Sequence, residues 1–416
     1  MRPTTATRGT AMPHDLSLLD KPGWYGGEPY PADALEHIAA LPAPQQPDWA
    51  AHEDLPAAVR DLRSAPGLVG PGDVDRFGLL VAEAAQGSVN ILQAGDCAED
   101  PADCTPGAVR AKVRMLDALA AAFSEVTGRP TVRVGRMGGQ YAKPRSRPTE
   151  RHRGRELPVF RGHMVNGPEP EAAARRHDPR RLTDCYRAAL SVHAALRPDT
   201  GWTRASTWTS HEALVLDYEL PLVRGDGSGR ALLSSTHWPW IGERTRSPRG
   251  AHARLLATVD NPVACKVGPT TTRAELMELC GLLDPERRPG RLTLIARQGA
   301  AAVRRSLPPL VECVRRAGHP VVWMCDPMHG NTVTTPAGRK TRLVEDVVRE
   351  VRGFRRAVES AGGTAGGLHL EATADDVLEC VADAGGIAGL EGRARPLCDP
   401  RLNLEQALTA VSAWRL

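Results

Sequence analysis

The sequence predicts an α/β protein, a (β/α)8 TIM barrel with an N-terminal extension and a helical insertion after the second strand. Three observations support this fold class. Short apolar, β-branched runs recur along the chain, longer stretches of helical periodicity separate them, and there are eight such strand–helix units. The chain has 416 residues, which suits a barrel of about 250 residues with insertions. A doubly wound open sheet is the main alternative, and the eightfold count favours the barrel.

The elements are expected in a regular order along the chain. Residues 1–45 are rich in proline, glycine and polar residues and predict an irregular N-terminal arm, while 46–416 are expected to form a single barrel domain. Residues 53–86 have helical spacing of apolar positions. The eight expected strands lie in 89–97, 131–137, 204–210, 232–244, 261–268, 291–299, 319–331 and 364–373. Helices are expected in 108–126, 180–197, 211–223, 273–283, 301–318 and 343–362, the second of them after a long connection that is rich in arginine and proline.

Composition excludes several classes of protein. The net charge of +4 comes from well-mixed charges, whereas nucleic-acid-binding proteins usually concentrate positive charge, so no nucleic-acid partner is expected. No apolar run approaches the ~18 residues of a membrane span, so no membrane partner is expected either. The N-terminus lacks an apolar segment followed by a cleavage site, and the nine cysteines are an odd number without CxxC spacing. We therefore expect a cytoplasmic protein.

The basic residues are strongly biased toward arginine. Only five of the 53 are lysine, which leaves 48 arginines. Such a chain should retain lysine where a compact ammonium differs from a planar guanidinium. This argument marks Lys143 and Lys266 before any motif is considered.

Charged or metal-ligating residues end nearly every expected strand. Because the active site of a barrel forms at the carboxyl ends of its strands, these residues are expected to meet at one mouth. They are Asp96, Cys97, Arg136, Glu243, Arg244, Lys266, Arg297, Asp326, His329 and Glu371.

One subset is cationic. It comprises Arg136, Lys143, Arg145, Arg244, Lys266 and Arg297. Six converging cations would repel one another, so they predict bound anions, and they exceed what a single monophosphate requires. Two anionic substrates are therefore plausible. The alternative is a set of surface salt bridges with nearby acids.

A second subset could hold a metal ion. Cys97, His329, Glu371 and Asp399 offer a thiolate, an imidazole and two carboxylates, which suit a divalent ion such as Mn, Fe, Co or Zn. Each residue also has an ordinary structural interpretation, as a buried thiol, a loop histidine or the partner of an arginine. The residue types and their positions at expected strand ends leave both a metal site and these structural roles open.

Ten segments together resemble a known family. They are LQAGDCAED, GRMGGQYAKPRS, RGHMVNG, TSHEALVLDYE, WIGERTR, NPVACKVGPTTT, LTLIARQG, CDPMHGNT, GGLHLEAT and CDPRLN, and PQQPDW in the N-terminal stretch matches as well. The chain resembles the type II 3-deoxy-D-arabino-heptulosonate 7-phosphate (DAHP) synthases over roughly residues 43–416. The resemblance implies a (β/α)8 barrel enzyme, a 3-deoxy-7-phosphoheptulonate synthase. Such an enzyme condenses phosphoenolpyruvate with erythrose 4-phosphate to DAHP and phosphate, the first step of the shikimate route.

The resemblance also implies roles for individual residues. The metal ligands fall on Cys97, His329, Glu371 and Asp399, with Mn²⁺ as the expected ion and Co²⁺ as an alternative. The phosphoenolpyruvate contacts fall on Arg136, Lys143, Glu243, Arg244, Lys266 and Arg297, and the aldose phosphate falls to Arg145 and Ser146. Lys143, Glu243 and His329 are the candidates for proton transfer. A homo-oligomer, most simply a dimer, is expected.

Departures from the family pattern keep alternatives open. The family's RGD-type motif reads Arg161–Gly162–His163 here, and the segment between Arg136 and Glu243 is shorter than in the large feedback-regulated members. This suggests a compact form of the kind found in secondary metabolism. The alternatives are an aminoDAHP synthase that uses an amino analogue of the aldose, a non-catalytic regulatory paralogue, and a barrel metallohydrolase, which explains the cation excess poorly.

Overall fold

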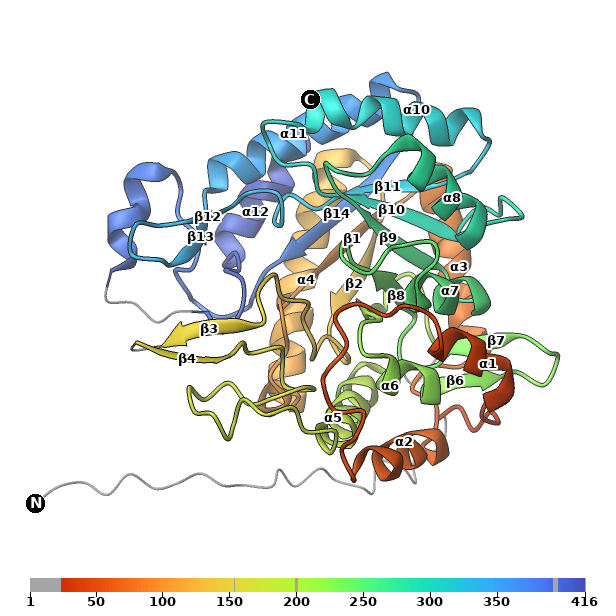
Figure 1. Ribbon diagram of the computed structural model, residues 1–416. Coiled ribbons are helices and arrows are strands. Elements are labelled where there is room, and N and C mark those ends of the chain that lie inside the picture. The colour runs from red at the N-terminus through yellow and green to blue at the C-terminus, as the bar shows by residue number, and fades with distance from the viewer. Residues whose placement is uncertain (1–23, 153, 199–200, 392–395, 416) are drawn as a thin grey trace, which may run out of the picture.

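Eight parallel strands close into a barrel at the centre of the molecule (Figure 1). The structure is a computed structural model that describes residues 24–152, 154–198, 201–391 and 396–415, so residues 1–23 of the expected arm lie outside the described residues. The strands neighbour one another in the order β1-β14-β11-β10-β9-β8-β5-β2. They are β1 (Asn90–Gly95), β2 (Thr131–Arg136), β5 (Thr207–Glu212), β8 (Trp238–Ile241), β9 (Val263–Val267), β10 (Leu292–Ala296), β11 (Val322–Cys325) and β14 (Thr364–Glu371). Each overlaps one expected run, which confirms the barrel.

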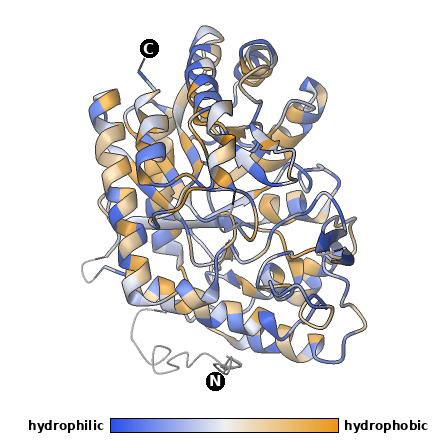
Figure 2. Ribbon diagram, turned by 90° about the vertical axis from the view of Figure 1, so that its left-hand side faces the viewer, coloured by the Kyte–Doolittle hydropathy of each residue, from blue (hydrophilic) through white to orange (hydrophobic). Residues whose placement is uncertain are grey.

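Helices surround the barrel and connect its strands. They are α1 (Ala32–Ala39), α2 (Leu55–Ser64), α3 (Pro71–Ala85), α4 (Pro106–Thr127), α5 (Arg181–Leu196), α6 (Leu216–Glu219), α7 (Ala251–Thr258), α8 (Arg273–Leu283), α9 (Val303–Ser306), α10 (Pro308–Arg316), α11 (Val344–Ser360) and α12 (Leu404–Ser412). Hydrophilic and hydrophobic residues alternate along the outer helices (Figure 2), as expected for helices with one face on a core. None of the described helices is both long and apolar enough to cross a bilayer.

Local sequence signals explain where the helices begin and end. At the start of α4 the Thr105 side chain accepts from the backbone N–H of Ala108, and Gly128 ends the helix with a left-handed φ of 68°. Helix α12 begins with a capping box between Asn403 and Gln406. Such caps satisfy backbone groups that the helix itself leaves unpaired.

Short hairpins and 3-10 turns decorate the connections. The hairpins are β3 (Thr149–His152) with β4 (Arg155–Pro158), β6 (Val223–Gly225) with β7 (Ala231–Leu233), and β12 (Thr332–Thr334) with β13 (Lys340–Arg342). The 3-10 turns are Pro101–Asp103, Leu220–Leu222 and Ala384–Leu390. The long connection after β2 carries the β3–β4 hairpin and then α5, in agreement with the expected helical insertion.

The helix expected in 211–223 is wrong for most of its length. His211 and Glu212 complete strand β5, and only Leu216–Glu219 and the following 3-10 turn are helical. Pro221 lies inside the 3-10 turn, and proline removes a backbone donor that a longer helix would need. In the arm, α1 is helical within the stretch expected to be irregular, while the division into arm and barrel domain stays a prediction.

Glycine allows the barrel strands to approach closely at one point. A Cβ atom on Gly367 of β14 would lie 2.1 Å from the backbone carbonyl oxygen of Ile91 on β1. Real Cβ atoms do not come so close to a carbonyl oxygen, so any larger side chain there requires the two paired strands to shift. The barrel therefore depends on glycine at this position.

We expect Gly367→Ala to lower the free energy of unfolding by about 1–3 kcal/mol, the usual cost of overpacking a core. Urea denaturation followed by tryptophan fluorescence measures it. Gly281→Ala on α8 is the matched control, because its Cβ meets nothing within 4 Å and alanine favours a helix by about 1 kcal/mol. A Gly367→Ala protein as stable as the control would contradict this account of the strand contact.

Candidate active site

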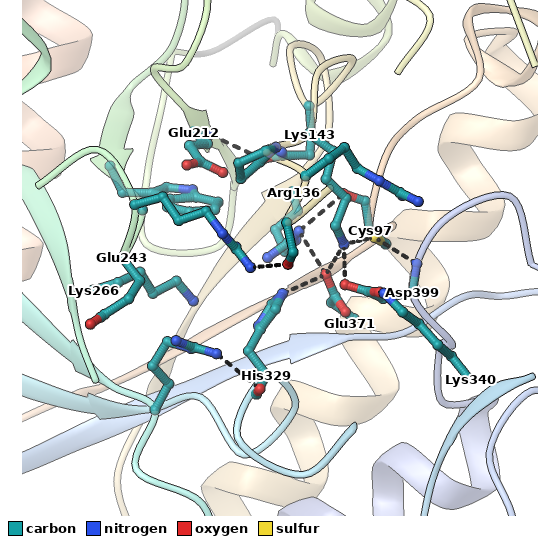
Figure 3. A pocket seen from close by; sticks show the side chains of 18 residues that line it. Cys97, Arg136, Lys143, Glu212, Glu243, Lys266, His329, Lys340, Glu371 and Asp399 are labelled. Atoms are coloured by element: carbon teal, nitrogen blue, oxygen red, sulfur yellow. Dashed lines mark hydrogen bonds and ion pairs between the residues drawn. The ribbon is translucent and has the colours of Figure 1, made fainter. Parts of the chain in front are cut away.

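A cavity opens at the carboxyl ends of the barrel strands (Figure 3). Together with the open solvent at its mouth, it spans about 640 Å³ of space that no protein atom fills. Every residue to which the sequence assigned a role lines it: Cys97, Arg136, Lys143, Arg145, Ser146, Glu243, Arg244, Lys266, Arg297, His329, Glu371 and Asp399. The cavity thus gathers both the cationic subset and the candidate metal ligands, while their individual roles stay predictions.

The alternation of side chains along each strand explains how these residues meet. In a barrel every second side chain points inward. On β2, Val132 and Val134 pack inside the barrel and Arg136 is the next inward position. On β14 the inward series passes through His369 to Glu371 at the carboxyl end of the strand. The apolar floor therefore gives way to charged residues at the mouth.

Three candidate ligands form a compact donor cluster. The Cys97 Sγ and one carboxylate oxygen each of Glu371 and Asp399 lie within 4.8 Å of one another. His329 adjoins this group, because its Nε2 lies 3.1 Å from Glu371 Oε1. Figure 3 shows these side chains pointing toward one another. The four predicted ligands are brought together.

A second carboxylate orients the imidazole of His329. Asp326 Oδ2 lies 2.8 Å from His329 Nδ1, which leaves Nε2 facing the donor cluster. Carboxylates commonly hold metal-binding histidines in this way. Burial alone would raise the pKa of Asp326, but His329 and Lys266 more than offset it, so the pKa lies well below its usual value. Asp326 is therefore an anion at neutral pH.

The donor cluster is strongly polarised. The Lys143 ammonium lies among the donors, 2.6 Å from Asp399 Oδ2 and in contact with Cys97 Sγ. Burial would raise the pKa of Glu371, but His329, Lys143 and Arg342 hold it well below the usual value. Burial raises the pKa of the Cys97 thiol, and the hydrogen bond that this thiol donates to Cys398 is the next cause. A neighbouring cation would favour the thiolate.

The cations fall into a buried group and a less buried group. Arg136, Lys143 and Lys266 are buried, and each of the two lysines contacts a carboxylate. Arg244 and Arg297 instead contact a hydroxyl and a carbonyl, with Arg244 Nη2 2.6 Å from Ser146 Oγ and Arg297 Nη2 2.9 Å from the His329 carbonyl oxygen. Charges without a direct carboxylate partner suit an anionic ligand.

Lys266 is a buried residue of the cavity wall. Its Nζ lies 2.6 Å from Asp326 Oδ2 and 4.9 Å from the centre of the Trp240 ring, a cation–π distance. Burial lowers its pKa to about 8 despite the attraction of Asp326, and Arg136 adds to the lowering. The ammonium is charged at neutral pH and loses its proton as the pH rises through about 8.

Buried carboxylates fix the loops that carry the cations. Glu99 accepts hydrogen bonds from the backbone N–H groups of Gly138, Gly139 and Gln140, at 3.0, 3.0 and 2.8 Å. This holds the loop between Arg136 and Lys143. Glu350 on α11 accepts from the backbone of Gln298 and Gly299 and from the Asn331 amide, which holds the loops that carry Arg297 and His329.

Sequence reasoning missed four residues that line the cavity and carry polar or aromatic side chains: Gln140, Glu212, Trp240 and Lys340. The Glu212 carboxyl is buried, burial raises its pKa, and its Oε1 has no hydrogen-bond partner among the described residues. Ending the third expected strand at Ser210 hid it, since period-two alternation from Trp208 through Ser210 leads to Glu212. Lys340 of β13 lies 2.9 Å from Asp399 Oδ1, and only its residue type could have marked it.

His163, the departure from the family motif, lies outside the cavity lining. Its Nε2 is 3.6 Å from Asp100 Oδ2, and burial lowers its pKa. Its segment contacts the backbone of a cavity residue, because the Arg161 carbonyl accepts a hydrogen bond from the Lys143 N–H at 2.9 Å. Gly162 has φ +97° and packs against the backbone of Tyr141, which requires glycine there.

The fold and the cavity define a barrel protein with a cation-rich cavity at the carboxyl ends of its strands, which also holds a cluster of three donors, Cys97, Glu371 and Asp399, that could bind a metal ion. Comparison with known proteins is more specific. The model of the Class-II DAHP synthetase family matches residues 34–200 and 188–413, so the chain belongs to that family.

Curated relatives agree with this membership. The chain is 52% identical to a probable phospho-2-dehydro-3-deoxyheptonate aldolase of Pseudomonas fluorescens, over 92% of this chain and 97% of the relative. It is 39% identical to a phospho-2-dehydro-3-deoxyheptonate aldolase of Streptomyces coelicolor, over 88% and 93%. It is 38% identical to the phospho-2-dehydro-3-deoxyheptonate aldolase AroG of Mycolicibacterium smegmatis, over 90% and 92%.

Proposed function

We propose that this protein is a metal-dependent 3-deoxy-7-phosphoheptulonate synthase that condenses phosphoenolpyruvate with erythrose 4-phosphate. The observation that carries the proposal is the meeting of seven cations and four candidate metal donors in one cavity of a chain that belongs to the Class-II DAHP synthetase family. Phospho-2-dehydro-3-deoxyheptonate aldolase, the name its relatives bear, denotes the same enzyme. Two phosphorylated substrates explain why the cations outnumber the needs of one anion.

The cations divide naturally between the two substrates. Arg244, Lys266 and Arg297 hold the phosphate of phosphoenolpyruvate, and Arg136 and Lys143 hold its carboxylate. Arg145 and the exposed Ser146 take the phosphate of the aldose. Fixing both substrates presents one face of the enol carbon to the aldehyde, and such positioning can supply up to about 7–11 kcal/mol of the barrier.

The donor set fits a divalent transition-metal ion. Cys97, His329, Glu371 and Asp399 offer one sulfur, one nitrogen and two oxygens. The sulfur and the two oxygens lie within 4.8 Å of one another, and His329 Nε2 lies 3.1 Å from Glu371 Oε1. Such an ion, Mn²⁺ or Co²⁺, supplies Lewis acidity that makes an aldehyde carbon electrophilic. Asp326 keeps His329 Nε2 turned toward the ligands, and Lys340 neutralises one oxygen of Asp399.

Protons must move in two places during the reaction. The enol carbon attacks the aldehyde, water adds to the phosphate-bearing carbon, and phosphate departs with its bridging oxygen. Glu243 is the candidate acceptor of the water proton, and Arg246 Nη2 donates to its Oε1 at 3.1 Å. Glu212, with its free oxygen and raised pKa, is a further candidate. Lys143 donates the proton to the new hydroxyl, because His329 Nδ1 faces Asp326 and its Nε2 faces the donor cluster.

The alternatives differ in what they require of the cavity. A regulatory paralogue has no need to keep the complete donor and cation sets, so these sets favour an active enzyme. An aminoDAHP synthase would share all of them and differ only around the aldose. The homodimer and the cytoplasmic location stay predictions.

We expect purified protein with Mn²⁺ to release phosphate from phosphoenolpyruvate when erythrose 4-phosphate is supplied. A coupled phosphate assay and mass detection of the seven-carbon product measure this. The amino analogue of the aldose, tested in parallel, should give no product. Product from the analogue alone would replace the proposal with an aminoDAHP synthase, and no product from either would refute both.

We expect Cys97→Ala and His329→Ala to weaken Mn²⁺ binding at least 100-fold and to abolish metal-dependent turnover, because each removes one of four donors. Calorimetric titration of Mn²⁺ measures the affinity, and circular dichroism checks the fold. Cys313→Ala is the matched control, since Cys313 lies on α10 outside the cavity. Normal Mn²⁺ affinity in either ligand variant would overturn the metal assignment.

We expect the affinity for phosphoenolpyruvate to fall as the pH rises through about 8. Lys266, whose pKa is about 8, is charged below that pH and neutral above it, so each further pH unit weakens binding up to about tenfold. Calorimetric titration from about pH 7 to about pH 10 measures the profile. Lys266→Arg, charged throughout this range, should remove the break, and an unchanged break in that variant would assign it to another group.

A further inference from the structure

Gln45 has an unusual backbone conformation. Its φ is 67°, and Arg287 (φ 52°) is the only other non-glycine residue with positive φ among the described residues. This left-handed region is sterically unfavourable for residues with a Cβ, and residues are held in it when surrounding contacts demand it. For Gln45, these contacts are hydrogen bonds to Arg145, which lines the cavity, and to Arg161.

Hydrogen bonds join Gln45 to the loop that carries Lys143, Arg145 and Ser146. The Gln45 Oε1 accepts from the backbone N–H of Arg145 at 2.8 Å. The Gln45 carbonyl oxygen accepts from Arg161 Nη2 at 2.5 Å, and the Arg161 carbonyl in turn accepts from the Lys143 N–H at 2.9 Å. These bonds form a closed ring around the backbone of residues 143–145.

The stretch around Gln45 is anchored by residues other than Gln45 itself. The Gln46 side-chain amide makes two hydrogen bonds to the backbone of the segment that follows β5. It donates to the Leu214 carbonyl at 2.8 Å and accepts from the Leu216 N–H at 2.9 Å. The buried Trp49 donates to Asp217 Oδ2 at 2.8 Å. In Figure 1 the connection between α1 and α2 is an extended loop. Changing Gln45 alone therefore leaves the arm docked.

The fixed loop presents two polar groups to the cavity. Ser146 Oγ accepts from Arg244 Nη2 at 2.6 Å, and Arg145 Nη2 lies 3.7 Å from Glu150 Oε2 on β3. Both residues line the cavity, and Gln45 bonds the main chain of Arg145 rather than either of these side chains. Gln45 thus acts on the backbone from which these two side chains extend.

We infer that Gln45 is a positioning residue for the second substrate. Its side-chain amide holds the Arg145 backbone so that Arg145 and Ser146 receive the aldose phosphate, and the strained backbone at Gln45 is the conformation that lets the amide reach. The inference rests on the proposed function, because it takes Arg145 and Ser146 as the grip on that phosphate. Because other residues hold phosphoenolpyruvate, its binding should not change when Gln45 is substituted.

Two substitutions separate positioning from strain. Gln45→Ala removes the hydrogen bond and keeps the strain, whereas Gln45→Gly removes both. Loss of one hydrogen bond predicts about a threefold to tenfold rise in KM for erythrose 4-phosphate in both variants, with KM for phosphoenolpyruvate changed less than about twofold. The unfolding midpoint should be higher for Gln45→Gly than for Gln45→Ala. Arg287→Gly relieves strain in a turn between α8 and β10 and should leave both KM values unchanged.

The readouts keep the inference and the proposed function apart. Turnover by the wild-type protein tests the function alone. Calorimetric titration of erythrose 4-phosphate into each protein tests Gln45 without turnover, and weaker binding by both variants is expected. Unchanged aldose affinity, an equal rise in both KM values, or a rise only in the less stable variant would overturn the positioning role.

Discussion

A single buried carboxylate, Glu371, organises the cavity. Its Oε2 lies 2.7 Å from Arg342, and its Oε1 lies 3.1 Å from His329 and 3.4 Å from Arg136. A fully buried charge is costly unless its partners compensate for lost hydration, so these groups must be in place for the strand end to fold as it does. Glu371 is thereby both the centre of an ion network and a member of the donor cluster. The candidate metal site and the anion site share this centre.

The barrel explains why so much of this arrangement could be read from the sequence. Apolar, β-branched runs identify strands regardless of what surrounds them, and parallel closure places their carboxyl ends together. Arg136, Lys266 and Glu371 follow from that rule, since each occupies an inward position at or near the end of its strand. Glu212 could not be identified from hydropathy, because its strand continues through polar residues. Only the alternation of side chains shows that Glu212 points inward.

Contacts between distant segments could not be predicted in the same way. Glu99 and Glu350 are buried acids whose partners are backbone N–H groups, and any residue type can supply such a group. Gln45 likewise bonds a main-chain amide 100 positions away in sequence. Nothing in residue type or spacing marks these pairings. They depend on how loops lie once the barrel has closed, and they supply the rigidity that substrate positioning requires.

The scarcity of lysine acquires a physical meaning in the folded chain. All four lysines that the structure describes belong to the site or support it. Lys143 and Lys266 lie in the cavity wall, Lys340 pairs with Asp399, and Lys112 Nζ lies 2.8 Å from Asp96 Oδ2. At Lys143 and Lys266 the charge sits in a narrow space between carboxylates and an aromatic ring or a thiol, where a compact ammonium fits and a planar guanidinium needs more room. Arginine serves elsewhere, including the exposed rim, where its fork can face a phosphate. Burial alone does not decide between the two cations, because Arg136 is as deeply buried as these two lysines. The space around the charge decides.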